Sequence, residues 1–464
     1  MPTRNYTYYD YTLSLCPECL KRIDAKIVFE GDKVYMLKRC PEHGRSKVLI
    51  ADDIAYYENL RNYNKPSETP YKFNTNTHYG CPYDCGLCPD HEQHSCLTII
   101  EITDRCNLTC PTCYAGSSPT YGRHRTLAEV KTMLDLVVEN EKEPDVIQIS
   151  GGEPTLHPDF FEILDYAKTL PIKHIMVNTN GIVIAKDFEF AKRLKSYSPD
   201  FEIYLQFDSF KEDALMSLRG ANLKSIREKA LAHLNKLNLS TTLVVTVQKG
   251  LNDNEIGKIV DFGLDQQCVR GVTFQPTQIA GRLTNFNHAT DRITLTEVRR
   301  KILEQTSIFN ADDLIPVPCN PDALVMGYVL KLAGNKIPLT RYINPSDLLD
   351  NSKNTIVYEQ DQALHQKMFE IFSTGTSTDK ASSKLHSLLC CLPFVKAPTL
   401  KYDNLFRIII MQFIDAHNFD VRAIKKSCVH IVSKDNKIIP FETMNLFYRD
   451  EKKDYLEKLR TQTI

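Results

Sequence analysis

The sequence predicts an α/β fold in which parallel strands alternate with helices and curve into a partial barrel of (β/α)6 type. Apolar, strand-like runs recur between residues 97 and 276, and helical patterns separate them. Groups of cysteines lie before and within this region, and the alternation stops near residue 300. We therefore expect a small metal-binding module before the barrel and an extension after it.

Composition limits the classes of protein that fit. The chain has 464 residues, enough for two or three domains. Its 57 Lys and Arg against 58 Asp and Glu leave a net charge of -1, which disfavours an extended nucleic-acid footprint. The start lacks the apolar core of a signal peptide, and the apolar run 405–414 is about half a membrane span. We expect a cytoplasmic protein, in which fifteen cysteines at short spacings indicate metal binding.

The first predicted unit, residues 1–65, is a module of the rubredoxin or zinc-ribbon kind. "CPEC" supplies Cys16 and Cys19, "CPEH" supplies Cys40 and His43, and a strand-like segment joins the two. Three thiolates and an imidazole suit tetrahedral Zn(II), and a mononuclear iron uses the same knuckles. We expect this site to be structural.

The second unit, residues 66–97, has four cysteines in a C-x3-C-x2-C-x7-C pattern, namely Cys81, Cys85, Cys88 and Cys96. Four thiolates can complete a closed [4Fe-4S] cluster. A third group follows as C-x3-C-x2-C, namely Cys106, Cys110 and Cys113, with no fourth cysteine nearby. Three ligands would leave one iron open to another molecule.

The predicted barrel occupies residues 98–300, and its first strand begins at the boundary of the preceding unit. The strand-like runs are 97–103, 145–150, 174–178, 201–207, 241–247 and 271–276. The clearest helix begins at Thr126, which forms a capping-box pattern with Glu129. In parallel α/β barrels the active site lies at the carboxyl ends of the strands. The third cysteine group follows the first strand, so we expect the chemistry there.

"CNLTCPTC" resembles the signature of the radical S-adenosylmethionine (radical SAM) enzymes. In that superfamily the open iron of a [4Fe-4S] cluster binds the methionine end of SAM. The sequence departs from the usual pattern because Thr112 precedes the last cysteine and the aromatic residue follows it as Tyr114. A zinc site or a simple electron-transfer cluster is the alternative interpretation. The resemblance implies a radical SAM barrel, with Cys106, Cys110 and Cys113 as the catalytic ligands.

Residues at the other strand ends are candidate SAM contacts beside Tyr114. "SGGEP" resembles the superfamily's GGE motif, and Asp208 could accept a hydrogen bond from a ribose hydroxyl. Arg219 could pair with the SAM carboxylate. For each residue alone, ordinary turn chemistry is an equal alternative. The expected set is Gly151, Gly152, Glu153, Asn178, Asn180, Gln206, Asp208, Arg219 and Gln275.

The order of motifs along the whole chain resembles the archaeal tetraether lipid synthases and their relatives. That resemblance implies coupling of two lipid alkyl ends through a carbon–carbon bond, with an auxiliary cluster that stores the first radical or relays electrons. It also implies a reducing donor such as ferredoxin or flavodoxin and transient contact with a membrane surface. Some relatives are linked instead to methylation of a pterin precursor. A non-catalytic iron–sulfur carrier is a third hypothesis, which the strand-end residues disfavour.

Residues 301–464 form the predicted carboxyl-terminal domain, for substrate or a further cluster. The candidate metal ligands there are Cys319, Cys390, Cys391 and Cys428. In relatives a cysteine is expected where this chain has Glu442, so either Glu442 ligates, or Cys390 or Cys391 completes the set, or no cluster forms. Buried structural cysteines are the alternative. Cys268 is interpreted as core. The apolar runs 323–334 and 405–414 could line a lipid cavity or form core strands.

Overall fold

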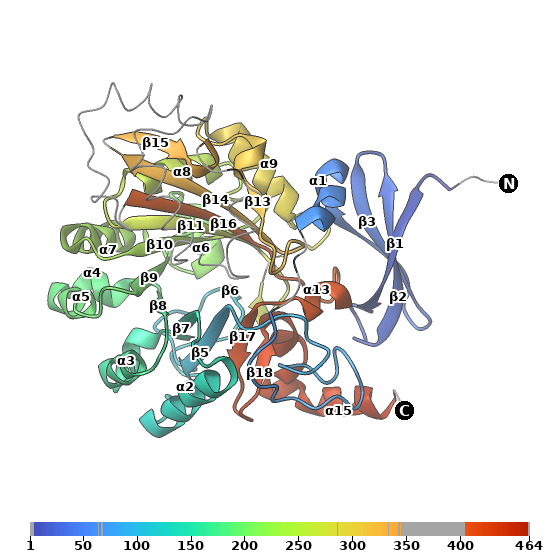
Figure 1. Ribbon diagram of the computed structural model, residues 1–464, viewed down its shortest axis with the longest axis horizontal. Helices are drawn as coiled ribbons and strands as arrows, with labels where there is room; N and C mark the ends of the chain where they lie inside the picture. The colour runs from blue at the N-terminus through green and yellow to red at the C-terminus, as the bar shows by residue number, and fades with distance from the viewer. Residues whose placement is uncertain are drawn as a thin grey trace, which may run out of the picture.

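The structure is a computed structural model that describes residues 4–63, 65, 68–284, 286–332, 334–341, 344 and 404–462. Figure 1 shows a small sheet at the amino terminus beside a larger α/β body. The elements of the small module are β1 (Thr7–Leu15), β2 (Arg22–Glu30), β3 (Lys33–Cys40), β4 (Gly44–Ala51) and α1 (Ile54–Asn59). The four strands pair antiparallel in chain order, as expected of a ribbon module.

A buried lysine joins the ribbon module to the larger body. Lys38 lies on β3, and its Nζ donates to the carbonyl of Leu15 at 2.8 Å and to the carbonyls of Ala416 and His417 at 2.9 and 2.7 Å. Burial lowers the pKa of Lys38 to about 8. Its three donors are all satisfied by carbonyl oxygens, so this lysine is a structural link between the two parts.

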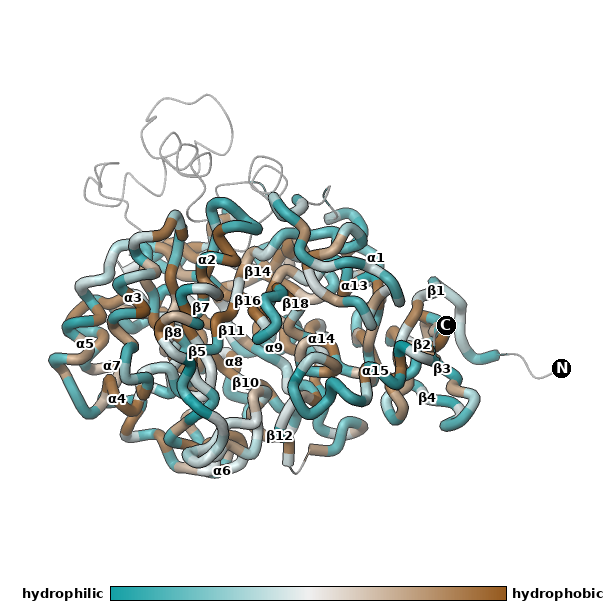
Figure 2. Tube along the Cα trace, turned by 90° about the horizontal axis from the view of Figure 1, so that it is seen from below, coloured by the Kyte–Doolittle hydropathy of each residue, from teal (hydrophilic) through white to brown (hydrophobic). Residues whose placement is uncertain are grey.

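The six predicted strands form one continuous parallel sheet in chain order, which confirms the predicted fold class. They are β5 (Leu97–Thr103), β7 (Val146–Gly151), β8 (His174–Thr179), β9 (Phe201–Gln206), β10 (Thr241–Val247) and β11 (Val269–Pro276). Every residue of β5 is buried, as befits a strand covered on both faces. Figure 2 shows hydrophobic segments concentrated along the central strands, with hydrophilic segments on the outer loops.

Helices cover the outer face of this sheet (Figure 1). They are α2 (Leu127–Glu141), α3 (Phe160–Thr169), α4 (Ile182–Lys186), α5 (Phe188–Lys195), α6 (Glu212–Arg219), α7 (Lys224–Leu237), α8 (Ile256–Asp265) and α9 (Leu295–Gln305). The predicted cap of α2 is confirmed: the Thr126 side chain accepts from the Glu129 N–H, and the Glu129 side chain accepts from the Thr126 N–H. Val130, Leu134 and Val137 form its buried face.

The carboxyl-terminal region extends the same sheet at both ends. Its elements are β13 (Ile315–Pro316), β14 (Leu324–Leu332), β15 (Asn335–Pro338), β16 (Leu405–Met411), α13 (Val421–Lys425), β17 (Val429–Val432), β18 (Ile438–Pro440), α14 (Phe441–Thr443) and α15 (Lys453–Thr461). Strand β16 pairs parallel with β11, and β17 pairs parallel with β5. Two apolar runs proposed as lipid-cavity walls thus include the strands β14 and β16. The described edges of the sheet are β13 and β18.

Candidate active site

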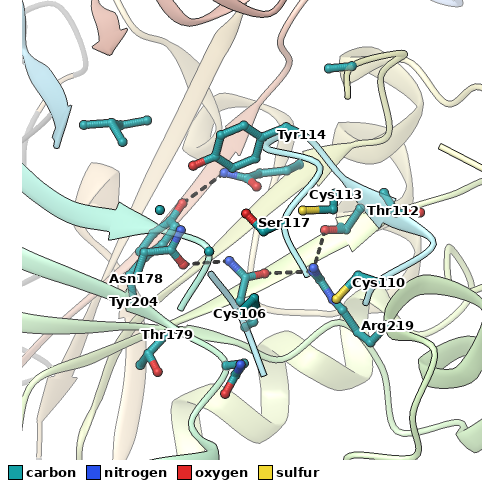
Figure 3. A pocket seen from close by; sticks show the side chains of 18 of the residues that line it. Cys106, Cys110, Thr112, Cys113, Tyr114, Ser117, Asn178, Thr179, Tyr204 and Arg219 are labelled. Carbon is teal, nitrogen blue, oxygen red and sulfur yellow. Dashed lines mark hydrogen bonds between the residues drawn. The ribbon is translucent and has the colours of Figure 1, made fainter. Parts of the chain in front are cut away.

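The third cysteine group lies in the loop that follows β5, as the sequence predicts. Cys106 and Cys110 are buried and Cys113 is half-buried, and all three line one cavity (Figure 3). Burial raises the pKa of the Cys106 thiol to about 12. Buried thiols of this kind stay protonated unless a cation stabilises the thiolates, so the group fits a positively charged iron centre.

An arginine that the sequence prediction missed holds this loop in shape. Arg282 pairs with Cys113 through two short strands, β6 (Thr112–Cys113) and β12 (Arg282–Leu283). Its guanidinium donates to the carbonyls of Cys110 at 2.6 Å, Gly116 at 3.2 Å and Ser117 at 2.6 Å. The sequence signal was its place just beyond the sixth strand, in "AGR". Three carbonyls fixed by one guanidinium make Arg282 a positioning residue for the cysteine loop.

The glycine pair of "SGGEP" packs directly against the start of that loop. A Cβ at Gly151 would lie 2.2 Å from the Thr103 carbonyl oxygen, and one at Gly152 would lie 2.2 Å from that of Arg105. Gly151 also has a φ of +133°, which favours glycine. Both glycines are among the candidate SAM contacts expected from the sequence. The structure gives another reason for glycine here, which is close contact between two backbone segments.

Glu153 is buried and forms hydrogen bonds at the end of β8, the third strand of the barrel. Its carboxylate accepts from the Thr179 hydroxyl at 2.7 Å and from the Asn180 backbone N–H at 2.8 Å. It also accepts from the Thr155 hydroxyl at 2.6 Å. Burial raises its pKa. Glu153 and Asn180 both line the cavity, but the carboxylate oxygens are already engaged within the chain, so Glu153 acts mainly on the geometry of the cavity wall.

Asp208 follows the fourth strand of the barrel as predicted, but its carboxylate binds other residues of the chain and does not line the cavity. Its side chain is inaccessible, and it binds Arg219 at 2.6 and 2.8 Å, Arg227 at 2.7 Å and the Thr246 N–H at 3.1 Å. The two guanidinium groups, acting against burial, hold the pKa of Asp208 below its usual range. Because its oxygens already accept these hydrogen bonds, Asp208 positions two arginines that line the cavity. The predicted role of Asp208 as a ribose acceptor does not fit this geometry.

The two arginines differ in how many of their guanidinium hydrogen-bond donors have partners. Arg219 lines the same cavity as Cys110, and its charge lowers the pKa of that thiol against the larger effect of burial. Arg227, which the sequence prediction missed, is 2% exposed, and its Nη1 has no hydrogen-bond partner among the described residues. A buried guanidinium nitrogen without a partner is costly unless a ligand supplies an acceptor. The cavity therefore offers cationic donors to an anionic group such as a carboxylate.

One wall of the cavity is a chain of amide and hydroxyl groups (Figure 3). Arg219 donates to the Gln206 amide oxygen at 2.8 Å, and the Gln206 amide nitrogen donates to Asn178 at 2.8 Å. Asn178 donates in turn to the Ser150 hydroxyl at 3.2 Å, which lies 3.3 Å from the Tyr114 hydroxyl. These contacts bring Tyr114, Asn178, Gln206 and Arg219 of the expected set together.

Apolar side chains line another part of the cavity, beside Gln148, Gln278 and Gln275, and Gln275 donates to the Tyr204 hydroxyl at 3.2 Å. Its apolar lining is Leu97, Ile99, Leu108, Met411, Phe413, Val429 and Phe441. The site thus combines flat hydrophobic surfaces with donors and acceptors along one side. That combination suits a ring system with polar edges.

The amino-terminal metal group is assembled as predicted. The ligand atoms of Cys16, Cys19, Cys40 and His43 all lie within 4.8 Å of one another. The Cys19 and Cys40 sulfurs are 3.8 Å apart, and the His43 Nδ1 lies 3.5 Å from the Cys16 sulfur and 3.4 Å from the Cys40 sulfur. Ligands of a tetrahedral Zn–S centre with bonds of about 2.3 Å lie about 3.8 Å apart. The four residues fit a mononuclear metal.

The second cysteine group is arranged differently from the prediction. The Cys96 sulfur lies within 4.8 Å of those of Cys319 and Cys428, so its predicted membership of a cluster with Cys81, Cys85 and Cys88 is wrong. A seven-residue spacing could not reveal partners that lie more than two hundred residues away. The Cys81 thiol raises the pKa of Cys85, and Cys85 contributes to the raised pKa of Cys88, so electrostatic interactions connect these three cysteines.

The remaining predicted ligands of the carboxyl-terminal region have separate outcomes. Cys390 and Cys391 lie outside the described residues. Cys268 is buried in the hydrophobic core, as interpreted from the sequence. Glu442 is buried and accepts a hydrogen bond from the Ser427 hydroxyl at 3.0 Å, and burial raises its pKa to about 7. The nearby Cys428 adds to the rise in the pKa of Glu442, so this carboxyl lies beside that cysteine in the core.

Comparisons with known proteins agree with this geometry. The model of the radical SAM superfamily matches residues 100–263, and the model described as the HMPTM N-terminal zinc ribbon domain matches residues 8–52. The chain is 32% identical over 491 residues to a Methanocaldococcus jannaschii protein named 7,8-dihydro-6-hydroxymethylpterin dimethyltransferase. That match covers 95% of this chain and 94% of the relative.

Two further similarities are partial. The GTP 3′,8-cyclase of Limosilactobacillus fermentum is 28% identical over 185 residues, which cover 38% of this chain and 53% of that protein. The crystal structure of Streptococcus suis SuiB bound to S-adenosylmethionine is 17% identical, with a TM-score of 0.38, and covers 46% of this chain and 47% of that one. Neither match adds to the conclusions drawn from the full-length relative.

Fold, cysteine loop and family model together define a radical SAM enzyme with an amino-terminal zinc ribbon. The chain belongs to the radical SAM superfamily and, within it, to the family of the Methanocaldococcus protein. The enzyme uses a [4Fe-4S] cluster and SAM, its ribbon indicates zinc, and its further cysteine groups indicate auxiliary centres. Within the described residues, no helix is long and apolar enough to cross a membrane.

Proposed function

We propose that this enzyme is a radical SAM methyltransferase that acts on a reduced pterin. The observation that carries the proposal is full-length similarity to a relative with that activity in its name. The sequence resemblance to tetraether lipid synthases instead favours lipid coupling, with pterin methylation as the alternative. The comparisons lend lipid coupling no support, and the transient membrane contact expected with it is not part of this proposal.

The proposed cluster ligands are Cys106, Cys110 and Cys113. When bound, the cluster supplies the electron that cleaves SAM to methionine and a 5′-deoxyadenosyl radical. The chain contributes the cavity that these cysteines line. It also contributes two cationic donors, Arg219 and Arg227, that suit the SAM carboxylate. A reducing protein of the ferredoxin or flavodoxin kind is the proposed electron donor.

The cavity chemistry favours a heterocycle over an alkyl chain. A pterin has flat faces and a row of ring nitrogens and exocyclic groups that both donate and accept. The apolar surfaces of Phe413 and Phe441 can contact the faces, and the amides of Gln148, Asn178 and Gln275 can pair with the edge. A polar group buried against an alkyl chain would lose its partners, which costs about 1–3 kcal/mol for each group.

The other proposed metal sites lie outside this cavity. Cys81, Cys85 and Cys88 are the proposed ligands of an auxiliary cluster. Cys16, Cys19, Cys40 and His43 are the proposed ligands of the ribbon zinc, whose role is structural. None of these seven residues lines the cavity that holds the SAM-binding cysteines.

The test is an anaerobic incubation of the reconstituted enzyme with dithionite, SAM and 7,8-dihydro-6-hydroxymethylpterin. We expect mass spectrometry to show 5′-deoxyadenosine and S-adenosylhomocysteine, together with pterin in which methyl groups from a second SAM replace hydrogen and dithionite supplies the electrons. A variant with Gln275→Leu should raise the KM for the pterin, because an edge partner is lost. Its matched control is Gln267→Leu, an exposed residue before the start of the same strand.

The same incubation with a total lipid extract in place of the pterin tests the alternative hypothesis, which is coupling of lipid chains. Coupled lipid without any methylated pterin would overturn the proposal. Deoxyadenosine without product from either substrate would also count against it, since the named substrate would then fail to react.

A further inference from the structure

A second cavity, of about 350 Å³, adjoins the cavity that the SAM-binding cysteines line. The two cavities share Tyr114, Ser117 and Gly151 as lining residues. Much of the remaining wall of the second cavity comes from two carboxyl-terminal segments, 432–435 and 444–453. A cavity of this volume suits a small molecule or one end of a larger one.

A buried hydroxyl at the boundary between the two cavities lacks a partner. Ser117 is 1% exposed and lines both cavities (Figure 3), and its Oγ makes no hydrogen bond within the described part of the chain. A buried polar group without a partner is costly, and in folded proteins it commonly marks the place of a water molecule or an ion. A ligand in the second cavity can supply the acceptor that this hydroxyl lacks.

Two arginines of the second cavity have unused donors. Arg125 is 7% exposed, and its guanidinium has one acceptor among the described residues, the Asp104 carboxylate at 3.3 Å. Arg449 donates to Glu101 at 2.7 and 2.9 Å and to the Asn445 amide oxygen at 3.1 Å. A guanidinium has five N–H groups, so both arginines keep donors for a further acceptor.

Lys452 is a third cation of this wall, and the chain gives it no ion pair. Its ammonium group forms no hydrogen bond or ion pair with the residues that the structure describes. Burial lowers the pKa of Lys452, and the neighbouring Arg449 lowers it further, while Glu451 acts in the opposite direction. A cation in this position is stabilised by an anion that enters the cavity.

The acidic residues of the wall do not use up these donors. Glu101, Asp104, Asp435 and Asp450 each form an ion pair with a cation of the same wall. Glu451 is exposed, so water and salt screen its charge. The donors that remain belong to two guanidinium groups and one ammonium group, and an anion with several acceptor oxygens can use them together.

We propose that the second cavity binds a phosphate group through Arg125, Arg449 and Lys452, with the Ser117 hydroxyl as a further donor. Phosphate has oxygens on several sides, and arginine binds it through paired N–H groups. The phosphate belongs either to the substrate, whose other end then lies in the SAM cavity, or to a separate molecule. The proposal is independent of the proposed methylation, because it concerns only the anion that this cavity holds.

The test is calorimetric titration of inorganic phosphate into the reconstituted full-length enzyme at constant ionic strength. Saturating SAM without reductant is present, so that the arginines of the first cavity are occupied. We expect about one phosphate per chain. Lys452→Met should weaken phosphate binding about tenfold, because a charged hydrogen bond is lost. Lys452→Arg, which keeps the charge, should retain the affinity.

The matched control is Lys458→Met, which changes an exposed lysine of α15 that does not line the cavity. It should bind phosphate like the wild type. Lys452 has no partner in the described chain to lose, so circular dichroism should show folded protein for each variant. Absence of phosphate binding by the wild type, or unchanged affinity in Lys452→Met, would overturn the proposal. An equal loss in Lys458→Met would also overturn it, since general surface charge would then explain the binding.

A second titration distinguishes the two sources of the phosphate. It uses the phosphate ester of 7,8-dihydro-6-hydroxymethylpterin in place of inorganic phosphate. Tighter binding than that of both inorganic phosphate and the unmodified pterin would support the site and assign the phosphate to the substrate. Binding no tighter than that of inorganic phosphate, with the same loss in Lys452→Met, would support the site and assign the phosphate to a separate molecule.

Discussion

The two ends of β5 carry thiol sites of contrasting construction. At the carboxyl end, Cys106, Cys110 and Cys113 come from one short loop and line a cavity. At the amino end, Cys96 meets Cys319 and Cys428, which come from segments far along the chain. The first site is a local motif open to ligands, and the second is a buried assembly without such an opening. The contrast separates a group whose spacing shows in the sequence from a group that the fold assembles from distant segments.

The largest expected effect comes from removing the local site. Replacing Cys106, Cys110 and Cys113 with Ala should abolish 5′-deoxyadenosine formation, since no iron ligands remain in the cavity. Circular dichroism should show a folded protein, because the loop is held by Arg282 and not by the thiols alone. Deoxyadenosine at the wild-type rate would show that SAM is cleaved elsewhere.

Asp208→Asn tests how strongly the cavity depends on the buried carboxylate that pairs with its two arginines. The change leaves Arg219 and Arg227 without their shared carboxylate, and breaking a buried ion pair costs about 3–5 kcal/mol. Urea unfolding measures this loss, and SAM binding should weaken as well. A fall in stability with unchanged SAM affinity would limit Asp208 to a role in folding. Asp265→Asn, at the exposed end of α8, is the control.

Arg282→Gln tests whether Arg282 positions the cysteine loop for cluster binding. Glutamine cannot reach three carbonyls, so charged hydrogen bonds worth about 1.5–3 kcal/mol each are lost in part. We expect slower SAM cleavage and a lower iron content after reconstitution, with little change in global unfolding. Full iron loading at the wild-type rate would mean that the loop keeps its shape without this residue. Arg299, whose guanidinium also donates to backbone carbonyls but away from the cavity, supplies the control Arg299→Gln.

Thr126→Ala should have the smallest effect. It removes the capping box of α2, which costs about 1 kcal/mol of unfolding free energy. SAM cleavage should not change, since α2 lies on the outer face of the sheet. Chemical denaturation checks the first expectation and a deoxyadenosine assay the second. A loss of activity larger than the loss of stability would link α2 to the cavity.

Features with a local signature were predictable from the sequence. The six parallel strands follow from apolar runs, α2 from its cap and buried face, and the ribbon ligands from two short knuckles. The cysteine loop was placed correctly after the first strand. In each case the residues that act together lie close along the chain, so their spacing carries the information.

Features built from distant segments were not predictable. Nothing in the local pattern shows that β16 pairs beside β11 and β17 beside β5, or that Cys96 lies with Cys319 and Cys428. The predicted ribose contact of Asp208 failed for a related reason. Its position at a strand end suits a ligand contact, but Arg219 on α6 and Arg227 on α7 donate hydrogen bonds to its carboxylate. Long-range pairing decides such cases.

The most direct test of the central claim is a competition in one anaerobic tube that contains the enzyme, dithionite, SAM, 7,8-dihydro-6-hydroxymethylpterin and lipid extract. Mass spectrometry follows deoxyadenosine, methylated pterin and coupled lipid over time. The account predicts that methylated pterin accumulates in proportion to deoxyadenosine while the lipids stay unchanged. Coupled lipid that rises with deoxyadenosine, with the pterin left intact, would contradict it.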